Sequence, residues 1–248
     1  MKLRFEAEPD AYRITLDDPP LHILDIALLD ELRAALGRVR NDRHALIIDA
    51  SGSRAFSAGV AVQDHLGDRA ATMLRLFHDC FRILLRLDVV TVAIVDGPAL
   101  GGGCELAMAC DFVLASQAAT FGQPEIHLGV FAPVASYQQS RLLPPRKGLE
   151  LLLTGDPLSA PEAARLGLVN LVYTSPQEAE EWLHRLYRHS ASSLRFAKKA
   201  FRLAQSADFD ERLARVERLY LDDLMKTDDA TEGLKAFLEK RTPGWGGR

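Results

Sequence analysis

Residues 89–109 read VVTVAIVDGPALGGGCELAMA and combine three kinds of segment in one short piece. The run from Val89 to Val95 is continuously apolar, which is typical of a strand buried on both faces of a sheet. The glycine-rich GPALGGG follows it, and residues 103–109 have the composition of a short helix. Strand, glycine loop and helix in succession predict a layered α/β core whose ligand binds where the strands deliver their loops.

The same order of segments occurs upstream of this stretch. ALIIDA, residues 45–50, is a second continuous apolar run, and the loop SGSRAFSAGV follows it. Alternating or apolar runs predict further strands, and apolar residues at helical spacing predict helices. These strands are expected at residues 12–17, 112–116 and near 121, and the helices at 28–39 and 73–85.

The chain beyond Pro144 has a different character. Its segments carry many charged residues on their outer faces, which is typical of surface helices, so a helical appendage is expected there. The segment LVNLVY, residues 168–173, is the one strand candidate. The helices are expected to start near residues 146, 160, 176, 193 and 208.

Composition restricts the possible partners. The 248 residues carry 30 basic and 34 acidic side chains, for a net charge of −4, so no bulk field favours nucleic acid or an anionic membrane. The amino terminus shows no apolar signal region, and the run Val89–Val95 is too short to span a bilayer. Three cysteines without metal spacing fit a reducing compartment, so we expect a cytoplasmic protein.

Two loops follow the two apolar runs, and both contain glycine: AFSAGV at 55–60 and ALGGG at 99–103. Glycine lets a backbone turn tightly and bring its N–H groups close to a ligand. Two converging N–H groups would form an oxyanion hole, although the same glycines could simply pack a helix closely on a sheet. GPALGGG lacks the spacing and the lysine of a phosphate-binding loop, so that interpretation is weaker.

Two carboxylates lie among glycine, proline and apolar residues. Glu105 falls in the first turn of the helix that the glycines open, and Glu125 falls in GQPEIHLG, residues 122–129. An apolar pocket that excludes water tunes the pKa of such groups, and two carboxyls in different protonation states can serve as base and acid.

These residues carry a resemblance to a known family. VAIVDGPALGGGCELAMACDFVLAS (92–116), followed by FGQPEIHLG (121–129), resembles the central signature of the crotonase, or enoyl-CoA hydratase/isomerase, superfamily. The likeness extends from about Tyr12 to the carboxyl terminus. Further matching segments are ELRAAL (31–36), AFSAG (55–59), LLLTGDPLSAPEAARLGLVN (151–170) and EGLKAFLEKR (232–241).

The resemblance implies an α/β fold built as a spiral of ββα units with a C-terminal helical trimerisation region. It implies a core at residues 1–190 with an acyl-CoA site, and a helical region at 191–248 for oligomerisation and for covering CoA. A homotrimer or dimer of trimers is therefore expected. The implied substrate is an acyl-CoA thioester, with no cofactor and no metal.

The resemblance also implies roles for individual residues. The thioester oxygen would sit between the N–H groups of Val60 and Gly102. Glu105 would activate water and Glu125 would transfer a proton at Cα, which is the pairing of a hydratase. Substrate and CoA contacts would come from Ala58, Val60, Ala61, Val62, Gln63, Gly101, Gly102, Phe237 and Lys240.

The chain departs from the usual pattern of the family at two places. No glycine occurs between Gly129 and Gly148, where a glycine N–H commonly helps to hold the attacking water, and Pro133 in this segment has no N–H. Ala61 stands where the family usually has an acid. Both departures are similar to hydratases of cyclic dienoyl-CoA thioesters, which the chain also resembles at HILD (22–25), AVQDH (61–65) and LGVFAPVAS (128–136). Both straight-chain and cyclic substrates stay open.

Two other functions are considered. A double-bond isomerase would use one glutamate as a proton shuttle and add no water. A non-catalytic RNA-binding or scaffolding relative would need a basic helical face, whereas the arginines near Asp30 alternate with acids. We also expect His127 to share a face with Glu125 if that segment is extended, and Asp64 and His65 to belong to a plain loop or to border the acyl pocket.

Overall fold

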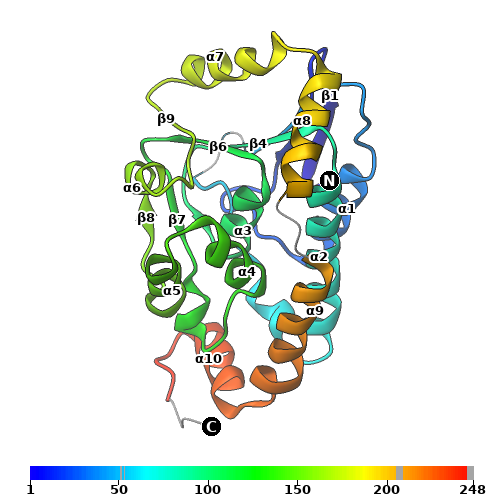
Figure 1. The fold of residues 1–248 in the computed structure, drawn as a ribbon. Helices are drawn as coiled ribbons and strands as arrows, with labels where there is room; N and C mark the ends of the chain where they lie inside the picture. Colours follow the sequence, from blue (N-terminus) through cyan, green and yellow to red (C-terminus); the bar gives the residue numbers. More distant parts are fainter. Residues whose placement is uncertain (51, 53, 205–208, 245–248) are drawn as a thin grey trace.

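A computed structural model describes residues 1–50, 52, 54–204 and 209–244 (Figure 1). Among these residues, a six-stranded sheet has the order β1-β2-β3-β4-β6-β9. The pair β1–β2 is antiparallel and the other neighbours are parallel. The strands are β1 (Leu3–Ala7), β2 (Ala11–Leu16), β3 (Ala45–Ala50), β4 (Val90–Val95), β6 (Phe112–Ser116) and β9 (Leu171–Tyr173).

Both faces of the central strands are buried, as the continuous apolar runs predict. Side chains alternate between the faces, so Leu46 and Ile48 of β3 belong to one apolar cluster and Ile47 belongs to the other. Helices α1 (Ile26–Leu36), α2 (Arg69–Arg86) and α3 (Gly102–Ala109) contribute to the first cluster, and α7 (Pro176–Tyr187) contributes to the second. The helix α8 (Ala191–Ala204) follows α7.

A smaller sheet of the described residues has the order β5-β7-β8, with β5 (Ala99–Leu100), β7 (Thr120–Gly122) and β8 (Leu158–Ser159). It brings the loop that precedes α3 beside the strand that leads to Glu125, because Leu100 pairs with Gly122. The short helix η1 (Val62–His65) precedes α2 in the chain, and η2 (Pro124–Leu128) follows β7. After η2 come α4 (Pro133–Leu142) and α5 (Pro145–Thr154), and α6 (Ala160–Arg165) follows β8.

The C-terminal helices pack against α4 and against the short helices η1 and η2. The helix α9 (Phe209–Arg218) packs against α4, and a π-helical turn η3 (Leu219–Asp223) and a short η4 (Leu224–Lys226) connect it to α10 (Asp228–Leu238). The helix α10 lies near the C-terminal end of the ribbon in Figure 1, and it contacts both η1 and η2. The end of the chain therefore covers the loops that precede α2 and α4.

Most of the predicted elements are confirmed. The strands at 45–50 and 112–116 have the predicted bounds, and the candidate at 168–173 forms β9. The chain beyond Pro144 is mostly helical with a strand at the predicted candidate, but the expectation of an appendage is wrong, because β9 pairs with β6 in the main sheet. The division into regions at residue 190 stays a prediction. None of the helices in the described part of the chain is long and apolar enough to cross a membrane.

Candidate active site

The loops after β3 and β4 converge, as the two glycine motifs predict. Ser57 pairs with Ala99 in a short parallel bridge, and Leu100 N donates to Ser57 O at 2.9 Å. Gly59 has φ +97°, and a Cβ there would lie 2.9 Å from Leu100 O and 3.4 Å from Gly102 N. Only glycine fits this close approach of two backbones, so its position in AFSAG follows from the geometry.

The N–H groups of Val60 and Gly102 are available for a ligand. Gly59 O and Ala61 N pair with Leu24, which leaves the Val60 N–H out of that bridge. Gly102 opens α3, where the first amides have no carbonyl partner within the helix. Neither amide donates a hydrogen bond to another residue that the structure describes. Two free donors beside each other match the requirement of an oxyanion hole.

A cavity of about 370 Å³ lies in front of these loops. Five residues of the predicted substrate site line it, namely Ala58, Val60, Val62, Gly101 and Phe237. Ala61, Gln63, Gly102 and Lys240 are not among the lining residues; Ala61 and Gly102 are buried behind the surface, and Gln63 and Lys240 are exposed. The lining also contains Gly59, His65, Pro124, Glu125, His127, Leu128 and Val130.

Glu105 is buried in the first turn of α3, with 2% of its surface exposed. Its Oε1 accepts a hydrogen bond from Ala135 N at 2.6 Å, and Gln138 Nε2 donates to the backbone oxygen of Glu105 at 3.1 Å. Both donors come from α4, whose first residue is Pro133. Proline suits the first helical position, because an N–H there would have no partner within the helix. The amides that follow it point toward the carboxylate, and the amide of Ala135 donates to it. The segment without glycine therefore serves to hold Glu105.

Glu125 lies on η2 and reaches back over Gly101. A Cβ on Gly101 would lie 2.4 Å from Glu125 Oε1, and Gly101 has φ +51°, so glycine is needed here for two reasons. Glu125 as a whole is half-buried, but its Oε2 atom is buried and has no hydrogen-bond partner among the described residues. The condition under which His127 would share a face with Glu125 is not met, because η2 is helical; His127 is exposed, with Nε2 2.8 Å from Thr154 O.

The two carboxyls form an electrostatically coupled pair. Desolvation, together with the charge of Glu125, raises the pKa of Glu105 to about 8. Desolvation raises the pKa of Glu125 to about 7. Because each negative charge opposes the other, the pair holds a proton near neutral pH that belongs to both groups. Such a pair can take up a proton at one oxygen and release one from another.

The other candidate residues have clearer structural roles. Asp64 is fully buried and accepts hydrogen bonds from Ile26 N at 3.0 Å and from Arg69 Nε at 2.9 Å, so it anchors η1 rather than lining the cavity. His65 does border the cavity, which is one of the two expected outcomes for it. Within the described residues, no cluster of three or more histidine, cysteine or acidic side chains could hold a metal ion.

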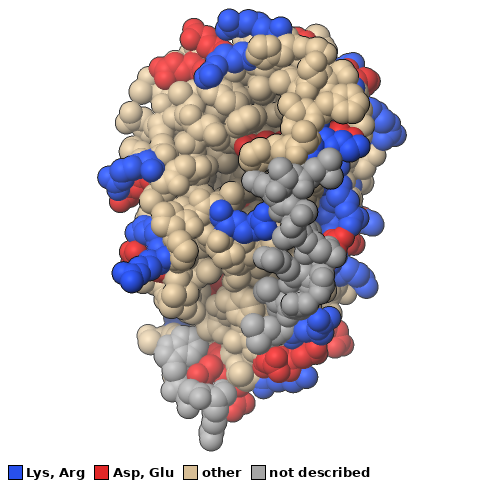
Figure 2. Space-filling model, viewed as in Figure 1, with Lys and Arg blue, Asp and Glu red and all other residues tan. Residues whose placement is uncertain are grey.

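Charge at the surface is mixed. On the face shown in Figure 2, basic and acidic side chains are interspersed around the rim, and the described residues there form no continuous basic surface. The net charge of −4 agrees with this distribution. The described residues on this face therefore form no basic stripe of the kind that nucleic-acid-binding proteins carry.

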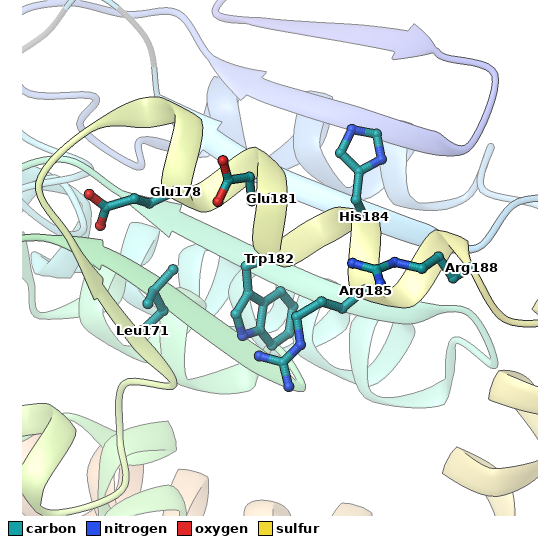
Figure 3. Close-up of a pocket in the computed structure, with 7 residues that line it drawn as sticks. All are labelled: Leu171, Glu178, Glu181, Trp182, His184, Arg185 and Arg188. Carbon is teal, nitrogen blue, oxygen red and sulfur yellow. The ribbon is translucent and has the colours of Figure 1, made fainter.

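A second depression, of about 520 Å³, lies along α7. Trp182 and Arg185 extend from the same side of this helix, whereas His184 extends from the other side (Figure 3). The Arg185 guanidinium lies 5.8 Å from the centre of the Trp182 ring. The depression is open, and of its two acids Glu178 is half-buried and Glu181 is exposed, so it lacks a buried carboxyl pair.

Comparisons with known proteins agree with this geometry. The family described as enoyl-CoA hydratase/isomerase matches residues 7–248. The cyclohexa-1,5-dienecarbonyl-CoA hydratase of Thauera aromatica is 40% identical, over 100% of this chain and 97% of that protein. The crotonyl-CoA hydratase of Syntrophomonas wolfei is 35% identical, over 89% of this chain and 88% of that protein.

Solved structures show the same likeness. An enoyl-CoA hydratase from Mycobacterium avium subsp. paratuberculosis superposes with a TM-score of 0.87 at 26% identity, over 99% of this chain and 98% of that chain. A carnitinyl-CoA hydratase from Mycobacterium avium gives a TM-score of 0.86 at 30% identity, over 100% of this chain and 99% of that chain. The predicted fold class is confirmed.

Proposed function

The chain belongs to the enoyl-CoA hydratase/isomerase family, and we propose that it is a hydro-lyase that adds water to an α,β-unsaturated acyl-CoA thioester. One observation carries the proposal. Two carboxyls with raised pKa values form a coupled pair, in which Glu125 lines the cavity and Glu105 is buried and does not line it. The free amide of Val60 belongs to a lining residue, and the free amide of Gly102 follows the lining residue Gly101. This is the set of groups that hydration needs.

The proposed reaction begins with the thioester oxygen between the amides of Val60 and Gly102. Their N–H groups stabilise the negative charge that develops on this oxygen as water attacks Cβ. The water oxygen forms the new bond to Cβ, one proton of the water passes to Glu105, and Glu125 gives a proton to Cα. One water is consumed, and the pair is ready for the next turnover once the proton has moved from Glu105 to Glu125.

Hydrogen bonds support this division of roles. The N–H of Ala135 donates to Glu105 and favours its ionised form, whereas Glu125 Oε2 has no donor and is free to carry a proton. Burial and the charge of Glu125 give Glu105 the higher of the two pKa values, so the resting proton favours Glu105. Because the two pKa values lie close together, the proton moves from Glu105 to Glu125 at little cost, and this transfer precedes the attack of water. No cofactor is needed beyond the coenzyme A of the substrate.

Within this class we propose a cyclic conjugated dienoyl-CoA as the substrate. The relative from Thauera aromatica, whose name gives a cyclohexadiene thioester, matches the whole chain at 40% identity. Apolar side chains of Val62, Leu128 and Val130 line the cavity and would contact a ring. The segment that begins α4 with Pro133 also replaces the glycine run expected for straight-chain substrates.

The experiment that tests the function uses two substrates in parallel, crotonyl-CoA and cyclohexa-1,5-diene-1-carbonyl-CoA, with product mass as the readout. Hydration adds the mass of one water, whereas isomerisation adds none. We expect Glu105→Gln and Glu125→Gln each to lower kcat by about 10²–10⁴-fold, which is the usual contribution of a general acid or base. Glu150→Gln, on the exposed face of α5, serves as the control. Parental rates in both variants would refute the assigned roles.

CoA recognition is proposed for the end of α10. Phe237 lines the cavity with 54% of its surface exposed, and Lys240 is an exposed cation three residues further along the chain. The adenosine and phosphate groups of CoA offer a ring and negative charge for these side chains.

A homotrimer or dimer of trimers is proposed as the assembly. Large apolar side chains are exposed on α8, at Phe196 and Phe201, and on α5, at Leu149 and Leu153. Apolar surface of this kind commonly marks an interface. Light scattering of the purified protein measures the assembly mass.

The cytoplasm is the proposed location, which suits the buried free thiols of Cys80, Cys104 and Cys110.

A further inference from the structure

Tyr220 carries a buried hydroxyl that the mechanism above does not use. The residue lies on the π-helical turn η3, only 1% of its surface is exposed, and its hydroxyl has no hydrogen-bond partner among the described residues. Buried hydroxyls are nearly always hydrogen-bonded, so one without a protein partner calls for another. π-Helical turns also occur frequently at functional sites.

Tyr220 is not among the residues that line the cavity, but its ring lies beside the connection between the elements that carry and hold the two carboxyls. Its ring packs edge-on against Phe131 with the ring centres 5.2 Å apart. Phe131 lies in the short connection between η2, which carries Glu125, and α4, which holds Glu105. Desolvation, and then the charges of Glu125 and Glu105, raise the pKa of the phenol. The phenol therefore stays protonated at neutral pH.

In the proposed reaction, none of the residues assigned so far donates a hydrogen bond to the water oxygen. Glu105 accepts a hydrogen from the water, and the proton of Glu125 is reserved for Cα. The amide of Ala135 at the start of α4 already donates to Glu105, and Pro133 has no N–H to offer. A third group that donates to the water oxygen would fix the direction of its attacking lone pair.

We propose that Tyr220 is a further catalytic residue, whose hydroxyl donates a hydrogen bond to the oxygen of the water that adds to Cβ. This inference rests on the proposed function. Tyr220 keeps its proton throughout: the water proton goes to Glu105, and the Cα proton comes from Glu125. In the reverse reaction the same hydroxyl donates to the departing oxygen.

The test compares the parent with Tyr220→Phe, which removes the hydroxyl and keeps the ring against Phe131. Tyr12→Phe is the matched control, because the Tyr12 hydroxyl already has a partner and donates to Asp42 at 2.8 Å. Two rates are measured on each protein: hydration of the unsaturated thioester, and exchange of the Cα protons of a saturated acyl-CoA with solvent deuterium. The exchange uses Glu125 and the oxyanion hole without any water addition.

We expect Tyr220→Phe to lower kcat for hydration about 10- to 100-fold, with KM and the midpoint of thermal unfolding close to the parental values. The rate of deuterium exchange should stay within about twofold of the parent, because the hydroxyl acts on the water alone. Unchanged hydration, an equal fall in both rates, or a variant that fails to fold would each overturn the proposal. If the parent itself adds no water to either substrate, the proposed function fails instead, which is a separate result.

Discussion

The substitution Glu105→Gln is expected to make the protein more stable at alkaline pH. Glu105 is buried in an apolar environment, and its ionised form is opposed by desolvation and by the charge of Glu125. Glutamine has nearly the same shape, carries no charge, and can still accept the hydrogen bond from Ala135 N. The substitution therefore removes a cost of folding and keeps the contact with α4.

The size of the effect follows from the raised pKa. Below pH 4.5 the carboxyl is protonated in both folded and unfolded chains, so the raised pKa affects stability little. Between 4.5 and about 8 the unfolded chain loses a proton that the folded protein keeps, so the free energy of unfolding falls as pH rises. At about 1.4 kcal/mol per pH unit the full loss approaches about 5 kcal/mol, and we expect 2–5 kcal/mol because Glu125 shares the proton.

The assay is thermal unfolding of both proteins at pH 5 and at pH 9. A stabilisation of 2–5 kcal/mol at pH 9 corresponds to a rise in Tm of roughly 4–20 °C for a chain of this length. At pH 5 the two midpoints should nearly coincide, and the control Glu150→Gln should match the parent at both pH values. If the difference in stability between Glu105→Gln and the parent were the same at pH 5 and at pH 9, the assignment of Glu105 as a buried, coupled carboxyl would be refuted.

Three further predictions follow from the same site. The profile of kcat/KM against pH should be bell-shaped around neutral pH, because the rate falls when Glu105 is protonated at low pH and when the pair has lost its shared proton at high pH; steady-state rates from pH 5 to 10 measure it. Gly101→Ala should lower kcat by at least about 10²-fold, because its Cβ would lie 2.4 Å from Glu125 Oε1, whereas Gly67→Ala, also at positive φ but with open space around it, should leave kcat near the parental value. Asp64→Ala should lower the free energy of unfolding by about 1–3 kcal/mol in a denaturant titration, because Ile26 N loses its buried acceptor; an unchanged stability would contradict the anchoring role.

Local pattern was sufficient to predict the central strands. The runs at residues 45–50 and 89–95 have no polar face, and both became strands with side chains in two apolar clusters. The strand β1 was missed because its alternation, with only Leu3 fully buried, is weak and partly charged. The helix α4 was also missed, although Pro133 at its first position is a recognised start signal.

Some features of the candidate site could likewise be predicted from local sequence, whereas others depend on contacts between distant residues. Glycine at positions 59 and 101 could be predicted to allow close approach, and the structure adds that both have positive φ beside a neighbouring backbone or carboxylate. Pairing of Glu105 with α4 depends on contacts between residues 30 positions apart, which no local pattern contains. Tyr220 was not predicted for the same reason, since its partners lie on segments about ninety residues earlier in the chain.

The most direct measurement is a crystal structure of the Glu125→Gln variant with an unsaturated acyl-CoA bound. We expect the thioester oxygen to lie about 2.7–3.1 Å from both Val60 N and Gly102 N, with Cβ facing the carboxylate of Glu105. A thioester whose oxygen contacts neither amide, or whose Cβ faces away from Glu105, would contradict the account.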